Sequence, residues 1–391
     1  MTLIRSTCYS ISLLLSSVAI DVHAVDSLTE AIKDGELGLN FRLRYEDVDQ
    51  SGVESVDLTS LKTRLTYETA SYKGWRGLIE FDDVTHVGDF DGGITDPEGT
   101  EVNQAAVSYS WNKTSVKYGR QRILLDNQRF VGGVGFRQNE QTYDSLSLTH
   151  SGWKDTKIFL SHIHNVNRIF GEDNPAGDHE NDSYLFNLHY SGLSFGKFSA
   201  YAYLLDNEDA VGFSTDTYGL RFSGKREWLG YTLEYARQSD AADNSANYTA
   251  DYGLVELIYQ PKGWKGVFGY ELLGADGSDG QFITPLATLH KFQGWADQFL
   301  GGGTGNIPGG IEDVYVSIST QLSGVKLVAV YHQFESDDSA ASGMGDLGSE
   351  WGISVAKAVG PVGLSLKYAD YSADDFASDI DKLWLTAEVK F

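Results

Sequence analysis

The chain has 391 residues, a formal net charge of -25, and 43 glycines against six prolines. Its only cysteine, Cys8, precedes residue 25, so a chain that begins there has neither a disulfide framework nor thiolate chemistry. We expect no nucleic-acid partner for so acidic a protein. The abundance of glycine and tyrosine suits a chain made mostly of strands and turns.

Residues 1–24 have the pattern of an export signal. Arg5 gives a positive start, a mostly apolar run follows, and cleavage after Ala24 satisfies the small-residue rule. We therefore expect the mature protein to span residues 25–391, with a short periplasmic segment at 25–34.

Apolar and polar side chains alternate along most of the mature chain. Leu37, Leu39 and Phe41, for example, alternate with Gly38 and Asn40. Side chains on a strand point to opposite faces with a period of two, so such a stretch has one apolar and one polar face. No apolar run here reaches the roughly 18 residues that a transmembrane helix needs. The pattern predicts about eighteen strands, at residues 35–48, 56–70, 74–86, 101–112, 114–123, 140–150, 155–166, 182–191, 196–206, 214–224, 227–238, 247–261, 263–275, 310–322, 324–335, 347–358, 360–371 and 380–391.

The connections between these strands alternate in length. Those after even-numbered strands are short, whereas several after odd-numbered strands are long and polar, namely 87–100, 124–139, 167–181, 276–309 and 336–346. Short turns at one rim and long loops at the other are typical of an antiparallel transmembrane β-barrel in a bacterial outer membrane. An even number of strands then places both termini on the periplasmic side, and 276–309 becomes a long extracellular loop.

Aromatic residues support a barrel over a soluble β-sandwich or β-helix. Five tryptophans flank the predicted short turns and suggest an interfacial girdle: Trp75, Trp111, Trp153, Trp228 and Trp264. The chain ends with an apolar face whose last member is Phe391. This last strand must pair with the first, because an open sheet edge in hydrocarbon leaves backbone groups unsatisfied. We expect the strand ending in Phe391 to engage the barrel-assembly machinery, and the barrel to contact outer-membrane lipid and lipopolysaccharide.

A glycine-rich stretch at the third long loop, 124–139, gathers arginines in this acidic chain. Arg129 and Arg137 lie in the loop itself. Arg120 and Arg122 precede it on the parity expected to face lipid, so we expect a bulge or the end of the strand to bring them toward the mouth. We predict that the loop folds inward and constricts the lumen.

The predicted lumen face supplies partners for these arginines. It carries Arg42, Arg44 and Arg64 on the first two strands, and Glu80 and Asp82 on the third. A string of guanidinium groups offers an anionic solute successive weak sites, as conduction requires. The alternative is that the arginines pair with nearby carboxylates and only brace the loop.

Three blocks resemble the alginate-export family of outer-membrane porins. They are Gly119–Ile123 with the following Asp126–Gly132 and Arg137–Thr142, then Asp96–Ala105, and finally Thr284–Phe292 with Gly294–Asp297. The resemblance implies an eighteen-stranded barrel with a cationic constriction, in a family named for export of an anionic polyuronate. It also implies a passage lined by Arg42, Arg44, Arg64, Arg120, Arg122, Arg129 and Arg137.

No motif for catalysis or for a cofactor stands out. Gly301–Gly305 lacks the Lys-Ser/Thr ending of a phosphate-binding loop, and His162 and His164 suggest a lumen-facing pair rather than a zinc site. The sequence therefore predicts a passive outer-membrane channel for small anionic or sugar-acid solutes in a Gram-negative bacterium, with no cofactor and no enzymatic activity. A barrel hydrolase, a general non-specific porin and a plugged structural barrel stay open as alternatives.

Overall fold

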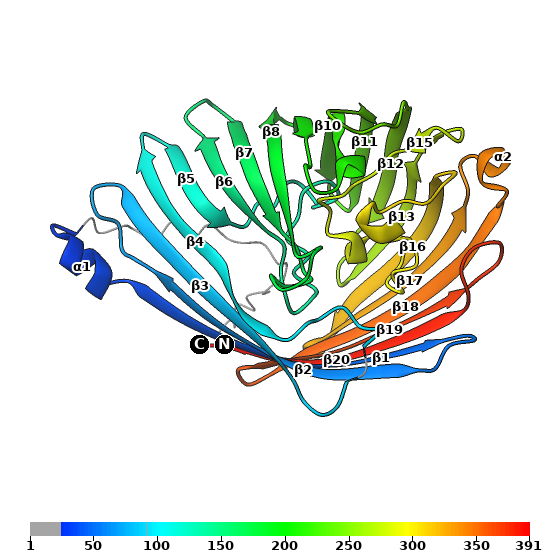
Figure 1. Ribbon diagram of the computed structural model, residues 1–391, viewed down its shortest axis with the longest axis horizontal. Helices are drawn as coiled ribbons and strands as arrows, with labels where there is room; N and C mark the ends of the chain where they lie inside the picture. Colours follow the sequence, from blue (N-terminus) through cyan, green and yellow to red (C-terminus); the bar gives the residue numbers. More distant parts are fainter. Residues whose placement is uncertain (1–24, 91) are drawn as a thin grey trace, which may run out of the picture.

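The computed structural model describes residues 25–90 and 92–391, so the predicted signal sequence lies outside the described residues. Eighteen antiparallel strands form one closed sheet, in which β1 pairs with both β2 and β20 (Figure 1). The strands of this sheet are β1 (Glu36–Gln50), β2 (Val56–Glu68), β3 (Trp75–His86), β4 (Gly99–Trp111), β5 (Thr114–Gln121), β6 (Thr142–His150), β7 (Thr156–Asn167), β8 (Asp178–Leu193), β9 (Gly196–Leu205), β10 (Thr215–Arg226), β11 (Leu229–Asp240), β12 (Thr249–Tyr259), β13 (Trp264–Leu273), β16 (Ile311–Leu322), β17 (Val325–Glu335), β18 (Asp346–Val359), β19 (Val362–Ser372) and β20 (Ile380–Lys390).

Few other elements occur in the described part of the chain. They are the helices α1 (Leu28–Lys33) and α2 (Ser339–Ser342), the 3₁₀ turns η1 (Val211–Phe213), η2 (Leu289–Lys291) and η3 (Gly301–Gly303), and a small hairpin of β14 (Ala275–Asp276) and β15 (Gly280–Gln281). No helix among the described residues is long and apolar enough to cross a membrane. Each of the eighteen predicted strands overlaps an observed one, and the predicted barrel is confirmed.

The barrel closes along the seam between its first and last strands. Phe41 lies opposite Val389 in the antiparallel register, and the pairing continues to Gln50 opposite Ile380. Beyond β20, the backbone N–H of Phe391 donates to the Leu39 carbonyl at 2.8 Å. The Phe391 ring also packs edge-on against Phe41, with 6.4 Å between ring centroids. Closure gives every strand of the barrel a partner on each side, so the eighteen-stranded sheet of the described residues has no open edge.

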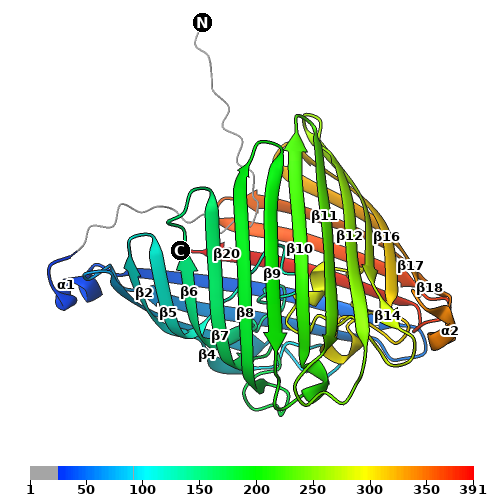
Figure 2. The same cartoon turned by 90° about the horizontal axis from the view of Figure 1, so that it is seen from above.

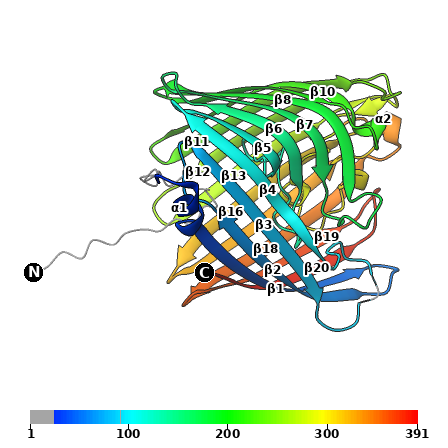
Figure 3. The same ribbon diagram turned by 60° about the vertical axis from the view of Figure 1, so that its left-hand side comes forward.

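The short turns and several of the tryptophans lie at one rim. Trp75, Trp228 and Trp264 begin or immediately precede strands at these turns, and their side chains are exposed. Helix α1 leads into β1 at the same rim, because β1 starts where β20 ends. Ser27 caps this helix, and its hydroxyl accepts a hydrogen bond from the Glu30 backbone N–H. Figures 2 and 3 show the tilted strands running from this rim to the one with the longer loops.

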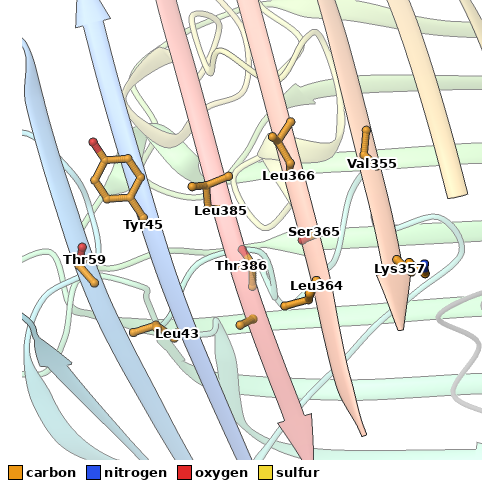
Figure 4. Close-up of a pocket in the computed structure, with 11 residues that line it drawn as sticks. Leu43, Tyr45, Thr59, Val355, Lys357, Leu364, Ser365, Leu366, Leu385 and Thr386 are labelled. Carbon is orange, nitrogen blue, oxygen red and sulfur yellow. The ribbon is translucent and has the colours of Figure 1, made fainter. Parts of the chain in front are cut away.

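The outer face of the sheet is apolar. Close to the seam, Leu43, Leu364, Leu366 and Leu385 line a shallow groove with a volume of about 440 Å³ (Figure 4). Each of these leucines is about two-fifths exposed. Such a surface is costly in water and stable against acyl chains, as a membrane-spanning barrel requires.

Cysteine pairs test the seam register, since Cys8 is the only natural cysteine. Phe41→Cys combined with Val389→Cys is expected to form a disulfide, because the two positions are direct partners in the register. Phe41→Cys with Leu385→Cys is the matched control, since the second cysteine is displaced by four residues. Gel mobility of the heated protein with and without reductant distinguishes them. Crosslinking of the control pair instead would contradict the register.

Candidate functional site in the barrel lumen

Two long connections fold into the barrel and contact each other (Figure 1). The first inward loop comprises residues 122–141, between β5 and β6, and the second comprises residues 282–310, ahead of β16. Val131 and Leu286 form a parallel bridge between them. The Thr288 hydroxyl accepts from the Val134 N–H at 3.1 Å, and a Cβ at position 132 would lie 2.3 Å from the same oxygen. Glycine at 132 therefore permits the two backbones to approach closely.

The β1 wall holds the first inward loop through two arginines. Arg42 donates from Nε to the Gln138 side chain at 2.7 Å, from Nη1 to the Gly135 carbonyl at 3.0 Å, and from Nη2 to the Arg137 carbonyl. Arg44 donates to the Phe136 carbonyl at 2.6 Å and lies 4.2 Å above the centroid of the Phe136 ring. Both side chains donate to neutral acceptors, and neither forms a direct ion pair.

A compact ionic network ties the end of the first inward loop to β2, β3 and the end of β5. Arg64 contacts Asp82 at 2.5 Å and Glu140 at 2.9 Å, and Arg122 pairs with both Glu80 and Glu140. The two arginines lower the pKa of the Glu140 carboxyl well below its usual range, even though burial opposes this shift. Two guanidinium groups face three carboxylates, so the network is close to charge balance and its main effect is to fix the loop.

A β-bulge supports this network. The register between β3 and β4 shifts after Glu80, which leaves Asn103 without a partner on β3. Asn103 and Gln104 consequently both donate side-chain hydrogen bonds to Glu80, at 2.7 and 3.2 Å. Adjacent residues of a regular strand point to opposite faces, so only a bulge allows both amides to reach one carboxylate.

Arg137 joins the two inward loops to the wall. Its guanidinium lies 3.1 Å from Glu46 on β1 and 3.1 Å from Asp297 in the second loop. Asp297 also accepts a hydrogen bond from His290 at 2.8 Å and lies 3.6 Å from Lys382 on β20. Arg137 and Asp297 are therefore the centre of the contact between both loops and the seam.

Arg129 is fully enclosed on the opposite side of the lumen. It pairs with Glu271 of β13 at 2.8 Å and donates to the Thr284 hydroxyl at 3.2 Å. Its guanidinium carbon lies 4.8 Å from the centroid of the Phe292 ring. Arg129 has 0% exposure, so its role in this structure is to anchor the first inward loop to β13.

Arg120 differs from the other arginines. Its register partners are Ala105 and Asp144, and it pairs with Asp144 at 3.0 Å. By register it shares the strand face of Tyr118, which is exposed on the outside of the barrel. Only Arg122, just beyond the end of β5, reaches the lumen network. We therefore leave Arg120 out of the proposed passage.

The two histidines of β7 are also placed differently from the expectation. His162 is the register partner of Leu146 and Tyr184, both of which are exposed on the outer face. Its Nε2 lies 2.8 Å from Asp182 and its ring stacks on Tyr184 at 4.7 Å. The exposed His164 stacks on Tyr118 of the outer face, with 6.2 Å between ring centroids, so the predicted lumen-facing pair is wrong. Within residues 25–90 and 92–391, no group of three or more His, Cys, Asp or Glu side chains is placed to hold a metal ion.

Two further lumen cations resemble Arg42 and Arg44 in lacking a carboxylate partner. Lys62 of β2 is 2% exposed and lies opposite Arg42 in the register. Lys367 of β19 lies 4.2 Å from the centroid of the Trp295 ring and 2.7 Å from the His290 imidazole. Within the described ranges, none of these four side chains has a carboxylate oxygen within 4.0 Å. Strand parity identifies Lys62 and Lys367 as lumen-facing, but sequence alone does not show that they are unpaired.

The fold defines the class of protein. A closed antiparallel barrel of eighteen strands with two inward loops is the architecture of a porin-like outer-membrane channel. Crystal structures of OccD3 (OpdP) from Pseudomonas aeruginosa and OccAB4 from Acinetobacter baumannii match it with TM-scores of 0.74 and 0.73, both at 14% identity. The first match covers 93% of this chain and 92% of the other, and the second covers 92% and 98%.

A family model described as "Alginate export" matches residues 34–278, which is more than half of the chain. The chain therefore belongs to the alginate export family, and the resemblance noted in its sequence is confirmed. No curated protein matches it. Family and fold together indicate the outer membrane of a Gram-negative bacterium, where the barrel contacts lipid and lipopolysaccharide.

Replacing Arg137 tests the anchoring of the inward loops. Arg137→Gln leaves Glu46 and Asp297 with a missing partner in a buried site, and breaking such a pair costs about 3–5 kcal/mol. We expect faster hydrogen exchange of residues 122–141 and 282–310 with the barrel strands unchanged. Arg120→Gln is the control, because its pair with Asp144 is partly exposed and should cost little. Equal exchange in the two variants would show that Arg137 does not hold the loops.

His290 gives the second inward loop a defined pH response. Burial lowers the pKa of the His290 imidazole to about 3, although Asp297 opposes the shift. In a loop released from the barrel wall, the His290 imidazole would have its ordinary pKa of about 6.5. Below that pH the released form therefore binds a proton that the buried form does not. Acidification from pH 7 to 4.5 therefore destabilises the buried position of the second inward loop, by up to about 1.4 kcal/mol per pH unit.

His290→Gln is the matched variant for this response. Glutamine can still donate to Asp297 and accept from Lys367, but it does not titrate. Hydrogen exchange of residues 282–300, corrected for the intrinsic effect of pH, should rise on acidification in the natural protein and rise less in the variant. The same pH dependence in both proteins would exclude His290 as the titrating group.

Proposed function

We propose that this protein is a passive outer-membrane channel whose lumen prefers anionic solutes, including small sugar acids. The observation that carries the proposal is the set of unpaired lumen cations on the wall formed by β1, β2 and β19. Arg42, Arg44, Lys62 and Lys367 have no carboxylate within ion-pairing distance among the described residues. They place positive charge inside a protein whose overall charge is strongly negative.

Two kinds of lumen cation have different roles in this proposal. Arg129 and Arg137 are enclosed in ion pairs and set the shape of the constriction. Arg64 and Arg122 are also paired, but their side chains keep 14% and 23% exposure and border the passage with Glu80 and Asp82. A solute carboxylate meets Arg64 and Arg122 as weak partners, and the mostly buried unpaired cations attract it through their field. Successive sites of moderate strength permit both entry and release.

The orientation and assembly of the barrel follow from the same architecture. We place both termini in the periplasm, because α1 and the end of β20 lie at the rim with the short turns. The exposed aromatic end of β20, Phe391, is the segment that we expect the barrel-assembly machinery to bind. The acidic long loops then face lipopolysaccharide outside the cell. The polyuronate of the family name is one solute class that this charge pattern suits, whether the protein exports or imports it.

Neutralising the unpaired cations tests the proposal. Lys62→Gln together with Lys367→Gln should shift the zero-current potential in a KCl gradient toward cation preference, because positive charge leaves the lumen. Arg120→Gln is the control for loss of a cation on the outer face and should leave this potential unchanged. If the double variant keeps the natural conductance and the natural zero-current potential, the protein is a general non-specific porin instead.

A further inference from the structure

The shallow groove on the outer face beside the seam, the seam groove, forms where a small side chain lies between larger ones. Ala387 of β20 is the register partner of both Leu43 on β1 and Leu364 on β19, and all three residues line the groove. In the next row toward the long loops, Leu385 takes the place of the alanine. The groove has a volume of about 440 Å³. Because a cavity of about 150 Å³ already holds benzene, the groove has room for a length of acyl chain.

A lysine lines the seam groove on its β18 side. Lys357 is the register partner of Leu364 and its side chain is exposed (Figure 4). Its other register partner, Val325 of β17, is apolar. No carboxylate of residues 25–90 or 92–391 lies within 4.0 Å of the Lys357 ammonium. This positive charge on the lipid-facing surface therefore has no ion-pair partner in the described protein, and the surrounding membrane is the source of one.

The position of Lys357 along β18 indicates the depth of this charge. The strand continues for only two residues beyond it, to Val359, and the chain re-enters the sheet at Val362. Lys357 thus lies close to the rim with the short turns, and its long side chain can extend its ammonium to the level of the lipid headgroups. Leu43 lies seven residues inside β1, so the groove leads from the headgroup level toward the middle of the barrel.

The long-loop end of the seam strands carries the opposite charge. Asp47, on the outer face by strand parity, is the register partner of Asp57. Asp49, on the same face, is the register partner of Asp381. Carboxylates directly opposite each other repel, and a phosphate at that end would add to the repulsion. A phosphate-bearing lipid is therefore favoured with its headgroup at the lysine end of the groove.

A second outer groove, on β5 to β9, has a similar shape and a different charge. Its volume is about 400 Å³, and its small residue is Ala202, the register partner of Phe186 and Tyr218. The residues that line it include no lysine or arginine. His162 in its wall lies 2.8 Å from the carboxylate of Asp182. The second groove therefore serves as a comparison that offers an acyl chain similar space without a lysine for the phosphate.

We propose that the seam groove binds one glycerophospholipid of net negative charge, with an acyl chain in the groove and the phosphate on Lys357. The acyl chain covers the leucines of the groove, and the phosphate supplies the missing partner of the ammonium. Since we place the short turns in the periplasm, the bound lipid belongs to the inner leaflet of the outer membrane. The groove is lined by both β1 and β20, so the lipid spans the closure of the barrel and stabilises the closed form.

The experiment is native mass spectrometry of the folded protein in a neutral detergent, titrated with phosphatidylglycerol or with phosphatidylcholine of the same acyl chains. We expect one phosphatidylglycerol to bind more tightly than phosphatidylcholine. Lys357→Gln should weaken phosphatidylglycerol binding by about fivefold and leave phosphatidylcholine binding nearly unchanged, because one charge at the headgroup is lost. Ala387→Leu should weaken binding of both lipids, because the larger side chain fills the groove.

Two variants control for charge and for shape. Lys326→Gln removes a lysine near the same rim from the opposite face of the wall, because the adjacent Val325 is the register partner of Lys357. Ala202→Leu fills the second groove in the same way as Ala387→Leu fills the seam groove. Neither control should change the binding of the first lipid. Heat-modifiable gel mobility verifies that every variant is folded.

Each outcome decides the proposal without reference to the solute of the channel. Equal binding of the two lipids by the natural protein, or equal loss in Lys357→Gln and Lys326→Gln, overturns the phosphate site. Unchanged binding in Ala387→Leu, or the same loss in Ala202→Leu, overturns the acyl-chain site. A protein dimer that excludes lipid and is lost in Ala387→Leu shows that a second copy of the chain occupies the groove instead. Loss of phosphatidylglycerol alone in Lys357→Gln, with loss of both lipids in Ala387→Leu, supports the site.

Discussion

The requirement that every backbone polar group finds a partner within the sheet governs this structure. In hydrocarbon an unpaired N–H or carbonyl costs several kcal/mol, so a spanning sheet must close on itself. The continuous register between β1 and β20 meets that requirement by closing the sheet of eighteen strands. The alternation of apolar and polar residues then directs leucines and aromatic residues to lipid and leaves the charged side chains in the lumen.

Those charged side chains build the interior. A lumen of polar groups would stay filled with water, but here two long connections enter it and are held by ion pairs that reach from β1 to β13. The loops bring carboxylates such as Glu140 and Asp297 to the arginines, which neutralises most of the guanidinium groups. Four cations left without a carboxylate lie along β1, β2 and β19. The acidic surface and the cationic interior are therefore consequences of one fold, in which paired charges hold the constriction and unpaired ones lie mostly buried in the wall beside it.

Sequence reasoning gave the strands accurately because their pattern is local. An apolar face with period two appears within ten residues, and even β7 and β17, where both faces carry apolar groups, were recognised. The lumen position of Arg42 and Lys62 follows from the same parity. The outward position of Arg120 also agrees with its parity, and the expected re-aiming applies to Arg122 alone, because β5 ends at Gln121.

The partners of the loop arginines could not be predicted in this way. Arg137 and Asp297 are 160 positions apart, and Arg129 and Glu271 are 142 apart. Their meeting depends on how two long loops fold together inside the barrel, for which no local period exists.

The most direct measurement of the central claim is the zero-current potential of the natural channel across a KCl gradient at neutral pH. The account predicts a sign that corresponds to preferred passage of chloride, and a sign that corresponds to preferred passage of potassium would contradict it.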